Sequence, residues 1–430
     1  MKKNYFIITI MYLTNLLIAD YPNFEVTINN NPYPEKLILH SMSNNDPHLG
    51  ILNDDLSLYW GVNNGNTGFD LKVINNHLSY YDKTHKFWII TDTMMTEVDT
   101  LRCANDIRTD YHEILILDNG GYILQGYDST WVDMSQIIDG GYYNALIRDI
   151  LIIQEFDSND SLIFEWDAAN YLDISNYNDY LPLTSPIITW MHGNSIEIDN
   201  DNNLLLSNRT NNEIFKIDRN SGEIIWTMGG PSNEFTFIND PLGGFNKQHD
   251  VRRIDNGNIT LFDNGTQHSP MISRALEYEV DELNKTATLV WDYNYPETLV
   301  SMSMGSVQRL PNNNTLISWG FFFESIILNA GSLVTEVDYE KNVVLEIKYP
   351  VGYYNYRARK SNWNFSVNTI PGDVNLDNII NVIDIINIIN HILEYQGINN
   401  VFHYHKMDLN TDNDINILDI IEMIDIITEI

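Results

Sequence analysis

The sequence predicts a mainly β fold: a six-bladed β-propeller followed by a small all-α module with two EF-hand-like calcium loops. Three observations lead to this prediction: short strand-like runs between Gly, Asn and Asp turns, an internal repeat of about 60 residues, and two acidic loops of one pattern near the C-terminus. The expected organisation is a signal peptide over 1–20, the propeller over 21–368 and the calcium-binding module over 371–430.

The first repeat marks the blades. An apolar residue and an aspartate precede a polar turn and a strand that ends near Trp, at Asp157, Asp218, Asp281 and, in a weaker copy, Asp338. A period of about 60 residues is typical of a propeller with several strands per blade, whereas a solenoid uses shorter repeats and a sandwich has no such period. The roughly 350 residues of this region therefore predict about six blades.

A second repeat sets a polar residue at matched points of successive units. These residues are His112, His192, His249 and Ser306, and the last three are about 57 residues apart. Because equivalent positions in successive blades lie on a ring around the propeller axis, we expect the three histidines to converge near one mouth of the channel. Two alternatives remain: each histidine bonds to backbone at a strand edge, or the three imidazoles hold zinc.

The segments around these histidines resemble the arylsulfotransferase (arylsulfate sulfotransferase) family, whose members are six-bladed propellers. The similarity is continuous from about His112 to Trp319. The segments that carry it are residues 190–195, 207–209, 217–230, 248–252, 261–265, 273–278 and 305–311.

The resemblance implies a transferase that moves a sulfuryl group from an aryl sulfate to a phenolic acceptor through a histidine nucleophile. A neutral imidazole can attack sulfur without a metal or other cofactor, and guanidinium groups bind sulfuryl oxygens in a bidentate way. His192, His249 and Arg274 match the family's motifs best, followed by His112 and Arg252. The resemblance makes His249 the candidate nucleophile and Arg274 the candidate holder of the oxyanion.

The position of the nucleophile departs from the family's pattern. In the next blade the matched position holds Ser306 instead of a histidine, and His268 lies in a turn before Arg274. The alternative function is a non-catalytic propeller that binds sulfated or acidic glycans. Another polysaccharide-active propeller, a lyase or a hydrolase, is a further alternative.

The chain is strongly acidic. It holds 59 Asp and Glu against 24 Lys and Arg, a formal net charge of −35. Such a surface argues against nucleic acid and anionic membranes as partners, and it means that an anionic substrate needs a local basic pocket. Cys103 is the only cysteine, so the chain has no internal disulfide.

The N-terminus has the pattern of a secretory signal. Lys2 and Lys3 precede an apolar run over 5–19 that is too short for a confident membrane span, and no later segment could cross a bilayer. We therefore expect a secreted, periplasmic or cell-surface protein without a membrane span in the mature chain. The alternative is that the run forms a buried strand.

The two acidic loops have the ligand spacing of a calcium-binding loop. Side-chain oxygens stand at positions 1, 3, 5, 9 and 12, with a backbone carbonyl at position 7. The residues are Asp373, Asn375, Asp377, Ile379, Asn381 and Asp384 in the first loop, and Asp408, Asn410, Asp412, Asp414, Asn416 and Asp419 in the second.

Each loop is followed by an apolar helix with a polar residue at every third position. The pair of loop-helix units resembles a type I dockerin. This resemblance implies two calcium ions and a partner that is a cohesin-type module or a cell-surface scaffold. The alternative is that calcium only stabilises a C-terminal cap.

Overall fold

The computed structural model describes residues 21–43, 46–63, 68–93, 97–296, 299–322, 330–364, 371–375, 379–393, 406–410, 412 and 414–429. The chain divides into two compact units, residues 22–367 and a unit that contains residues 368–430. The signal peptide expected over 1–20 lies outside the described residues. Among the helices of the described part, none has the length and apolar character to cross a membrane.

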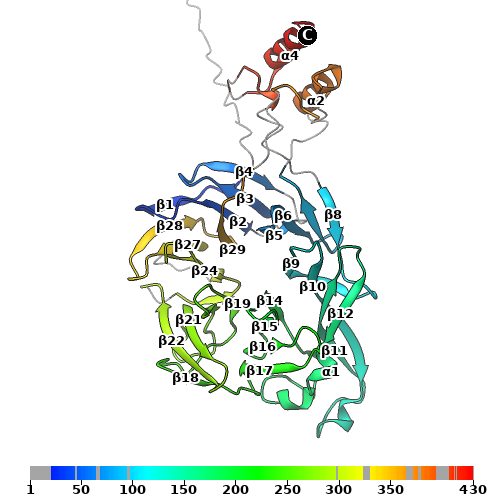
Figure 1. Cartoon of the computed structure of the whole chain (residues 1–430), viewed down its shortest axis with the longest axis vertical. Helices are drawn as coiled ribbons and strands as arrows, with labels where there is room; N and C mark the ends of the chain where they lie inside the picture. Colours follow the sequence, from blue (N-terminus) through cyan, green and yellow to red (C-terminus); the bar gives the residue numbers. More distant parts are fainter. Residues whose placement is uncertain are drawn as a thin grey trace, which may run out of the picture. The chain divides into compact units, whose positions relative to one another are not determined.

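The larger unit is a six-bladed propeller, as predicted. Six sheets surround a central axis (Figure 1), and each is built on four antiparallel strands. From the channel outwards, the blades are: blade 1, β29 (Tyr353–Ser361), β2 (Lys36–Ser43), β3 (Asp46–Leu52) and β4 (Leu58–Asn63); blade 2, β5 (Gly68–Ile74), β6 (His77–Asp82), β7 (Phe87–Thr91) and β8 (Glu97–Leu101); blade 3, β9 (Arg108–Ile116), β10 (Tyr122–Val132), β11 (Ala145–Phe156) and β12 (Leu162–Asp167).

The other three blades follow the same order. They are: blade 4, β14 (Gly193–Ile198), β15 (Leu204–Asn208), β16 (Glu213–Ile217) and β17 (Ile224–Gly229); blade 5, β19 (His249–Arg253), β20 (Ile259–Asp263), β21 (Arg274–Asp281), β22 (Thr286–Tyr293) and β18 (Thr236–Ile238); blade 6, β24 (Ser306–Arg309), β25 (Thr315–Ser318), β27 (Ser332–Val337), β28 (Val343–Tyr349) and β1 (Glu25–Asn29). Short elements join them: η1 (Met134–Gln136), α1 (Ala168–Tyr171), η2 (Ile174–Tyr177), β13 (Ile187–Thr189), β23 (Ser301–Ser303) and β26 (Phe321–Phe322).

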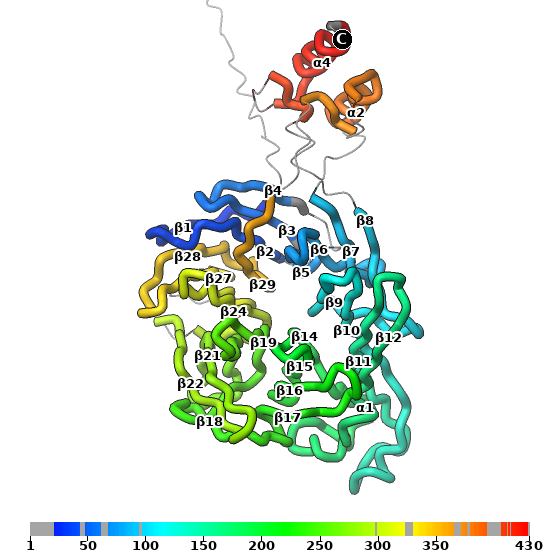
Figure 2. Tube along the Cα trace, in the orientation of Figure 1, coloured from blue at the N-terminus to red at the C-terminus, as the bar shows by residue number. Residues whose placement is uncertain are grey.

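Both ends of the propeller sequence close the ring. The last strand, β29, pairs with β2 and so forms the inner strand of blade 1. The first strand, β1, pairs with β28 on the outer edge of blade 6. Figure 2 shows the two closures as blue tube beside orange and yellow tube. Sequence segments from opposite ends therefore complete neighbouring blades, and the inner edge of blade 1 is not left unpaired.

The Asp-to-Trp repeat forms the hairpin between the third and fourth strands of blades 3 to 6. In blade 4, Asp218 Oδ1 accepts hydrogen bonds from the backbone N–H groups of Asn220 and Ser221, at 2.9 and 2.8 Å. In blades 3 to 5 the fourth strand then carries a buried tryptophan. In blade 3, Trp166 Nε1 donates to the backbone oxygen of Gly222 at 3.1 Å. The repeat therefore shapes one turn and joins it to the preceding blade.

The smaller unit holds helices α2 (Val382–Ile392) and α4 (Ile417–Glu429). Asn381 caps α2, and the side chain of Asp384 accepts the Asn381 N–H in return. The core is duplicated at an interval of about 35 residues, which is the spacing of the two acidic loops. Its buried members are Val374, Ile388, Met407, Ile415, Ile420 and Met423.

Candidate functional site

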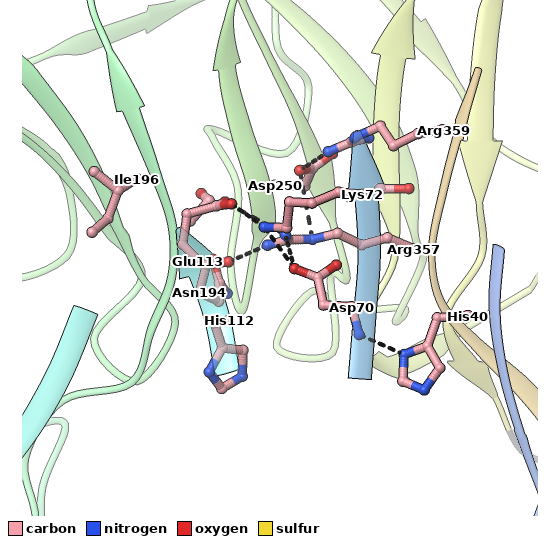
Figure 3. A network of polar contacts seen from close by, with 12 residues as sticks. His40, Asp70, Lys72, His112, Glu113, Asn194, Ile196, Asp250, Arg357 and Arg359 are labelled. Atoms are coloured by element: carbon pink, nitrogen blue, oxygen red, sulfur yellow. Dashed lines mark hydrogen bonds and ion pairs between the residues drawn. The ribbon is translucent and has the colours of Figure 1, made fainter. Parts of the chain in front are cut away.

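The inner strands carry irregularities at matched points. The pairing of β5, β9, β14 and β19 with their neighbours shifts register next to Asp70, Glu113, Asn194 and Asp250. Asp70 and Asp250 adopt positive φ, 50° and 59°, a conformation that non-glycine residues seldom take. A bulge re-aims the side chains around it. Consecutive residues consequently point to opposite sides, as Figure 3 shows for His112 and Glu113.

The three repeat histidines come together beside the channel. The rings of His112 and His192 meet edge to face with centroids 4.5 Å apart. The pKa of His249 is well below its ordinary range because of burial, the charge of Arg209 and the neighbouring imidazoles His192 and His112. Matched spacing in the sequence thus correctly predicted their convergence.

His249 uses both of its ring nitrogens. Nδ1 lies 2.6 Å from Asn264 Oδ1, and Nε2 accepts the backbone N–H of Met304 at 3.2 Å. The Asn264 amide nitrogen donates to the Met304 and Ser301 oxygens, at 3.1 and 3.2 Å, so its oxygen must be the atom that faces the histidine. His249 is therefore held as the neutral Nδ1–H tautomer, and its remaining lone pair is engaged.

His112 is oriented by a buried carboxylate. Its Nδ1 lies 2.6 Å from Asp110 Oδ2, which also accepts the His112 backbone N–H at 2.9 Å and the Gln125 amide at 2.8 Å. Burial alone would raise the pKa of Asp110, but the charge and hydrogen bonds of His112 outweigh it and lower that pKa. This places the proton on Nδ1 of His112 and leaves Nε2 as its basic nitrogen.

His192 is the partly exposed member of the cluster. Burial, reinforced by the charges of His112, Arg209 and Lys247, lowers its pKa to about 3. Its backbone is fixed, because Asn208 Oδ1 accepts the His192 N–H at 3.0 Å. Within the described ranges, neither ring nitrogen of His192 has a hydrogen-bond partner. At neutral pH this ring is an uncharged imidazole with a lone pair to spare.

Two cations that the sequence analysis did not select stand next to the histidines. Arg209 and Lys247 are both partly buried, and neither has a carboxylate partner within the part of the chain that the structure describes. Arg209 Nη2 donates to the Met302 oxygen at 3.0 Å, and Lys247 Nζ donates to the Thr210 oxygen at 2.6 Å. Burial and the charge of Arg209 lower the pKa of Lys247 to about 8. Their positive charge is available to a ligand.

Neither arginine selected from the sequence lies with the histidines. Arg274 begins β21 and binds Asp263 and Asp240, at 2.8 and 3.0 Å, and a main-chain oxygen. Arg252 lies in the channel, with Glu113 at 2.6 Å. Both guanidinium groups are occupied by the protein's own carboxylates.

The two other residues named for the nucleophile position are also engaged. Ser306 Oγ donates to the Ala358 oxygen at 3.2 Å and accepts the Ala358 N–H at 3.1 Å. His268 Nε2 lies 2.9 Å from Asp263 Oδ2. Neither is placed beside the three clustered histidines by a contact of its own.

An ion-pair network crosses the channel, and the ring of His112 lies to one side of it (Figure 3). Glu113 binds Arg252 and Lys72, Asp70 binds Lys72 at 2.7 Å and Arg357 at 3.0 Å, and Asp250 binds Arg252. Its charged members within the described residues are Asp70, Glu113, Glu197 and Asp250, with Lys72, Arg252, Arg357 and Arg359. Equal numbers of carboxylates and cations make this layer close to neutral.

The two loops that the sequence predicts to bind calcium close in the same way. Asp384 Oδ1 accepts the Val374 and Asn375 N–H groups at 2.8 and 3.0 Å, and Asp419 Oδ1 accepts those of Leu409 and Asn410 at 2.9 and 3.4 Å. A carboxylate has about four lone-pair sites, so each aspartate retains capacity for a cation.

One expected calcium ligand, Asp377, lies outside the described residues. Within the described ranges, no three His, Cys, Asp or Glu side chains are grouped as a metal site. The expected loops draw on Asn and main-chain oxygens as well as on Asp, which are the donors that calcium prefers.

Comparisons with solved structures find matches at low sequence identity. A protein of unknown function from Bacteroides caccae is 12% identical, with a TM-score of 0.48, and the match covers 76% of this chain and 98% of that one. An inactive virginiamycin B lyase variant from Staphylococcus aureus, with quinupristin, is 10% identical, with a TM-score of 0.39, over 76% and 89% of the two chains. No curated protein matches the sequence.

A family model described as Arylsulfotransferase (ASST) matches residues 60–357. That is well over half of the 430 residues. The match includes the histidine cluster, Arg209, Lys247 and most of the ion-pair network. The chain belongs to the arylsulfotransferase (ASST) family.

Proposed function

We propose that the propeller transfers a sulfuryl group from an aryl sulfate to a phenolic acceptor, with His192 as the nucleophile. The observation that supports it best is the pairing of a neutral, unengaged imidazole with Arg209 and Lys247, two cations that no described carboxylate neutralises. In a chain of net charge −35, this is a local positive site that could attract an anionic donor. Membership of the family supplies the reaction class.

In the proposed first step, a ring nitrogen of His192 attacks the sulfur and the aryl–oxygen bond to sulfur breaks. The phenolate leaves with the bonding electron pair and takes up the ring proton that His192 loses, relayed by the basic Nε2 of His112, which Asp110 orients. In the second step, His112 relays the proton of the acceptor phenol back to the ring of His192. The phenolate oxygen then attacks the sulfuryl group and releases neutral His192.

The remaining groups of the site position and neutralise charge. Arg209 and Lys247 would hold the sulfuryl oxygens while negative charge redistributes over them. His249, the nucleophile candidate from the sequence, is engaged at both ring nitrogens. We therefore assign it to fixing the Met304 main chain and the shape of the pocket, rather than to attack.

The test is release of phenol from a chromogenic aryl sulfate, with and without a phenolic acceptor. His192→Ala should abolish release, whereas His85→Ala, at an exposed histidine bonded to Asp82, should leave it unchanged. Intact-mass measurement of the donor-treated protein should show one sulfuryl adduct that His192→Ala lacks. Equal release by the wild type and His192→Ala would refute the assignment.

The second candidate is a non-catalytic propeller that binds sulfated or acidic glycans at the same pocket. It is favoured by Ser306, which occupies the matched position in blade 6 with its hydroxyl bonded to Ala358. This reading predicts no adduct and no phenol release. It also predicts glycan binding that His192→Ala keeps and that Arg209→Gln with Lys247→Gln removes.

For the smaller unit, we propose a dockerin that binds two calcium ions and attaches an exported protein to a cohesin-type module or a cell-surface scaffold. Calcium would cross-link the oxygens of each loop and so contribute to folding. The support is the duplication of exposed apolar residues on α2 and α4, a surface that a partner could cover. These residues are Val382, Ile383, Ile386 and Ile389, and Ile417, Leu418, Ile421 and Ile424.

Calorimetric titration with calcium tests the loops. Asp373→Ala with Asp408→Ala should remove calcium binding and the stabilisation that calcium gives to the smaller unit. Asp425→Ala, an exposed aspartate of α4, is the control and should change neither. Unchanged calcium binding in the double variant would reject the loop assignment. N-terminal sequencing of the secreted protein would test the signal peptide.

A further inference from the structure

A pocket opens in the channel, away from the histidines. It is a cavity of about 340 Å³, lined by strands β5, β9 and β29 together with Arg252 and Gln308. This volume is within the range of small-molecule sites. Five cationic side chains line it, against two carboxylates, Asp70 and Glu113. The cations are Lys72, Arg252, Arg357, Arg359 and Lys360.

The pocket lies on the far side of the ion-pair network. Side chains two residues apart share one face of a strand, so Lys72 and Ile74 follow Asp70 along the channel. Asp70 is fully buried, Lys72 nearly so, and Ile74 is partly exposed, which means that the channel opens in this direction. Figure 3 shows the ring of His112 and the guanidinium of Arg359 on opposite sides of the network.

Four of the five cations are satisfied by the protein. Lys72, Arg252 and Arg357 bind the network carboxylates, and Lys360 binds Glu336 at 2.6 Å. Arg359 differs, because only its Nη2 reaches a carboxylate, that of Asp250. Its Nη1 is buried and, within the described residues, has no hydrogen-bond partner. A buried guanidinium N–H without an acceptor is unfavourable, and an acceptor in the cavity would satisfy it.

We propose that this cavity binds a small organic oxyanion, a carboxylate or a sulfate ester, through Arg359. The planar guanidinium presents hydrogen-bond donors to either kind of oxygen pair. Ile74 and Leu115, which continue the channel faces of β5 and β9, would contact the carbon part of the ligand. The site is separate from the histidine cluster and does not require sulfuryl transfer.

The charge of the whole chain limits what can bind. At a net charge of −35, a large polyanion is repelled by the surface before it reaches the pocket. A compact anion with one or two charges needs only the Nη1 of Arg359, which lacks a hydrogen-bond partner among the described residues. This argument favours a small ligand over a nucleotide or a long acidic glycan.

Two probes distinguish the sources of the oxyanion: phenyl sulfate and sodium benzoate, titrated calorimetrically into the full chain at constant ionic strength. Arg359→Gln should weaken binding at this site at least tenfold. Leu115→Phe, which fills the cavity without changing its charge, should do the same. Arg209→Gln is the matched control, because it removes a guanidinium from the histidine pocket and should leave this site unchanged.

The outcomes separate this proposal from sulfuryl transfer. Loss of a binding event in Arg359→Gln and Leu115→Phe, but not in Arg209→Gln, supports the second site. Binding that is lost only in Arg209→Gln, or that neither probe shows up to about 10 mM, overturns it. If Arg359→Gln fails to fold, Leu115→Phe decides, and unchanged binding in that variant overturns the proposal.

Discussion

Two buried glutamates show how differently the two sides of the propeller channel treat charge. Glu113 lies in the ion-pair network and Glu213 lies behind the histidine cluster, at 2% and 0% exposure. Burial alone would raise the pKa of Glu113, but Arg252, Lys72 and Arg357 lower it to about 2. Burial raises the pKa of Glu213 to about 8, because only uncharged donors, the side chains of Asn208, Tyr177 and Asn211, oppose it. Equal burial therefore gives opposite protonation states.

The same contrast holds for the cations. In the network, Lys72, Arg252 and Arg357 are each bound to carboxylates, so their charge is used for the fold. Beside the histidines, Arg209 and Lys247 bond only to main-chain oxygens. Counting charged residues would not distinguish the two regions. The two regions differ in the partner that each cation has. The cations without a carboxylate partner are the reason for proposing that the reaction takes place at the histidines.

The largest expected effect comes from unbalancing the network. Asp250→Asn removes a carboxylate that binds Arg252 and Arg359, so it leaves buried cations uncompensated. We expect a loss of about 3–5 kcal/mol in the free energy of unfolding, measured by urea denaturation. Asp255→Asn, at an exposed turn, should cost little. A loss below about 1 kcal/mol for Asp250→Asn would show that the network contributes little to stability.

The network also predicts acid sensitivity. The folded-state pKa of Glu113, about 2, is below its ordinary value of 4.5. Its contribution to stability is therefore complete above pH 4.5 and is lost as the pH falls towards 2. Denaturation at a series of pH values should show this fall. Asp250→Asn should reduce it, because Arg359, Arg252 and Arg357 also lower the pKa of Asp250 against the effect of burial and the variant loses that contribution.

The propeller could be predicted because the residues that form one turn of each blade recur at a regular interval in the sequence. Asp218 and its equivalents shape one hairpin in each of blades 3 to 6, and a turn of this kind depends on a few adjacent residues. The copy of the repeat in blade 1 does not match the pattern, because Asn53 stands where blades 3 to 6 have Asp. Its tryptophan, Trp60, is present and buried. A single substitution thus concealed one copy of the repeat.

The histidine cluster was predictable for the same reason, but its cations were not. Arg209 and Lys247 lie outside the inner strands, on connecting segments whose path the blade period does not define. Arg252 could have been assigned to the network, since Asp250 is two residues away on one strand and such residues share a face. Resemblance instead placed Arg252 with the histidines. The ion pair of Arg274 with Asp263 could not be predicted either, because it depends on contacts that only the fold creates.

The third prediction tests the neutral glutamate. The folded-state pKa of Glu213, about 8, exceeds its ordinary value of 4.5, so the folded protein keeps a proton that the unfolded chain releases between these values. The free energy of unfolding should therefore fall as pH rises through that window. Glu213→Gln cannot titrate, and at pH 8 it should be more stable than the wild type, by about 3 kcal/mol.

Thermal or urea unfolding at pH 5 and pH 8 measures this difference. Glu223→Gln, at an exposed glutamate, is the matched control and should change stability equally little at both pH values. A Glu213→Gln variant that loses stability at pH 8 would mean that Glu213 is ionised in the folded protein. The asymmetry between the two glutamates would then be wrong.

A fourth prediction compares two histidines of one cluster. His249→Ala removes buried hydrogen bonds to Asn264 and Met304, and it should cost about 2 kcal/mol of unfolding free energy. His192→Ala removes a partly exposed ring without described hydrogen bonds, and it should cost less than about 1 kcal/mol. Urea denaturation of the two variants checks the order. Equal losses would imply that His192 is also a structural residue.

The smallest effect is expected outside both regions, at the turn of the repeat. Asp218→Ala removes an acceptor for the Asn220 and Ser221 N–H groups, but water can replace it because Asp218 is partly exposed and its two partners are exposed. We expect a loss of about 1 kcal/mol in unfolding free energy, with phenol release unchanged. Asp218→Asn keeps the accepting oxygen and should recover most of the loss. Asp218→Ala could instead cost as much unfolding free energy as Asp250→Asn. The stability of the blades would then depend on their outer turns as much as on the ion-pair network. The contrast between the paired charges of the network and the unpaired cations beside the histidines would no longer explain what holds the propeller together.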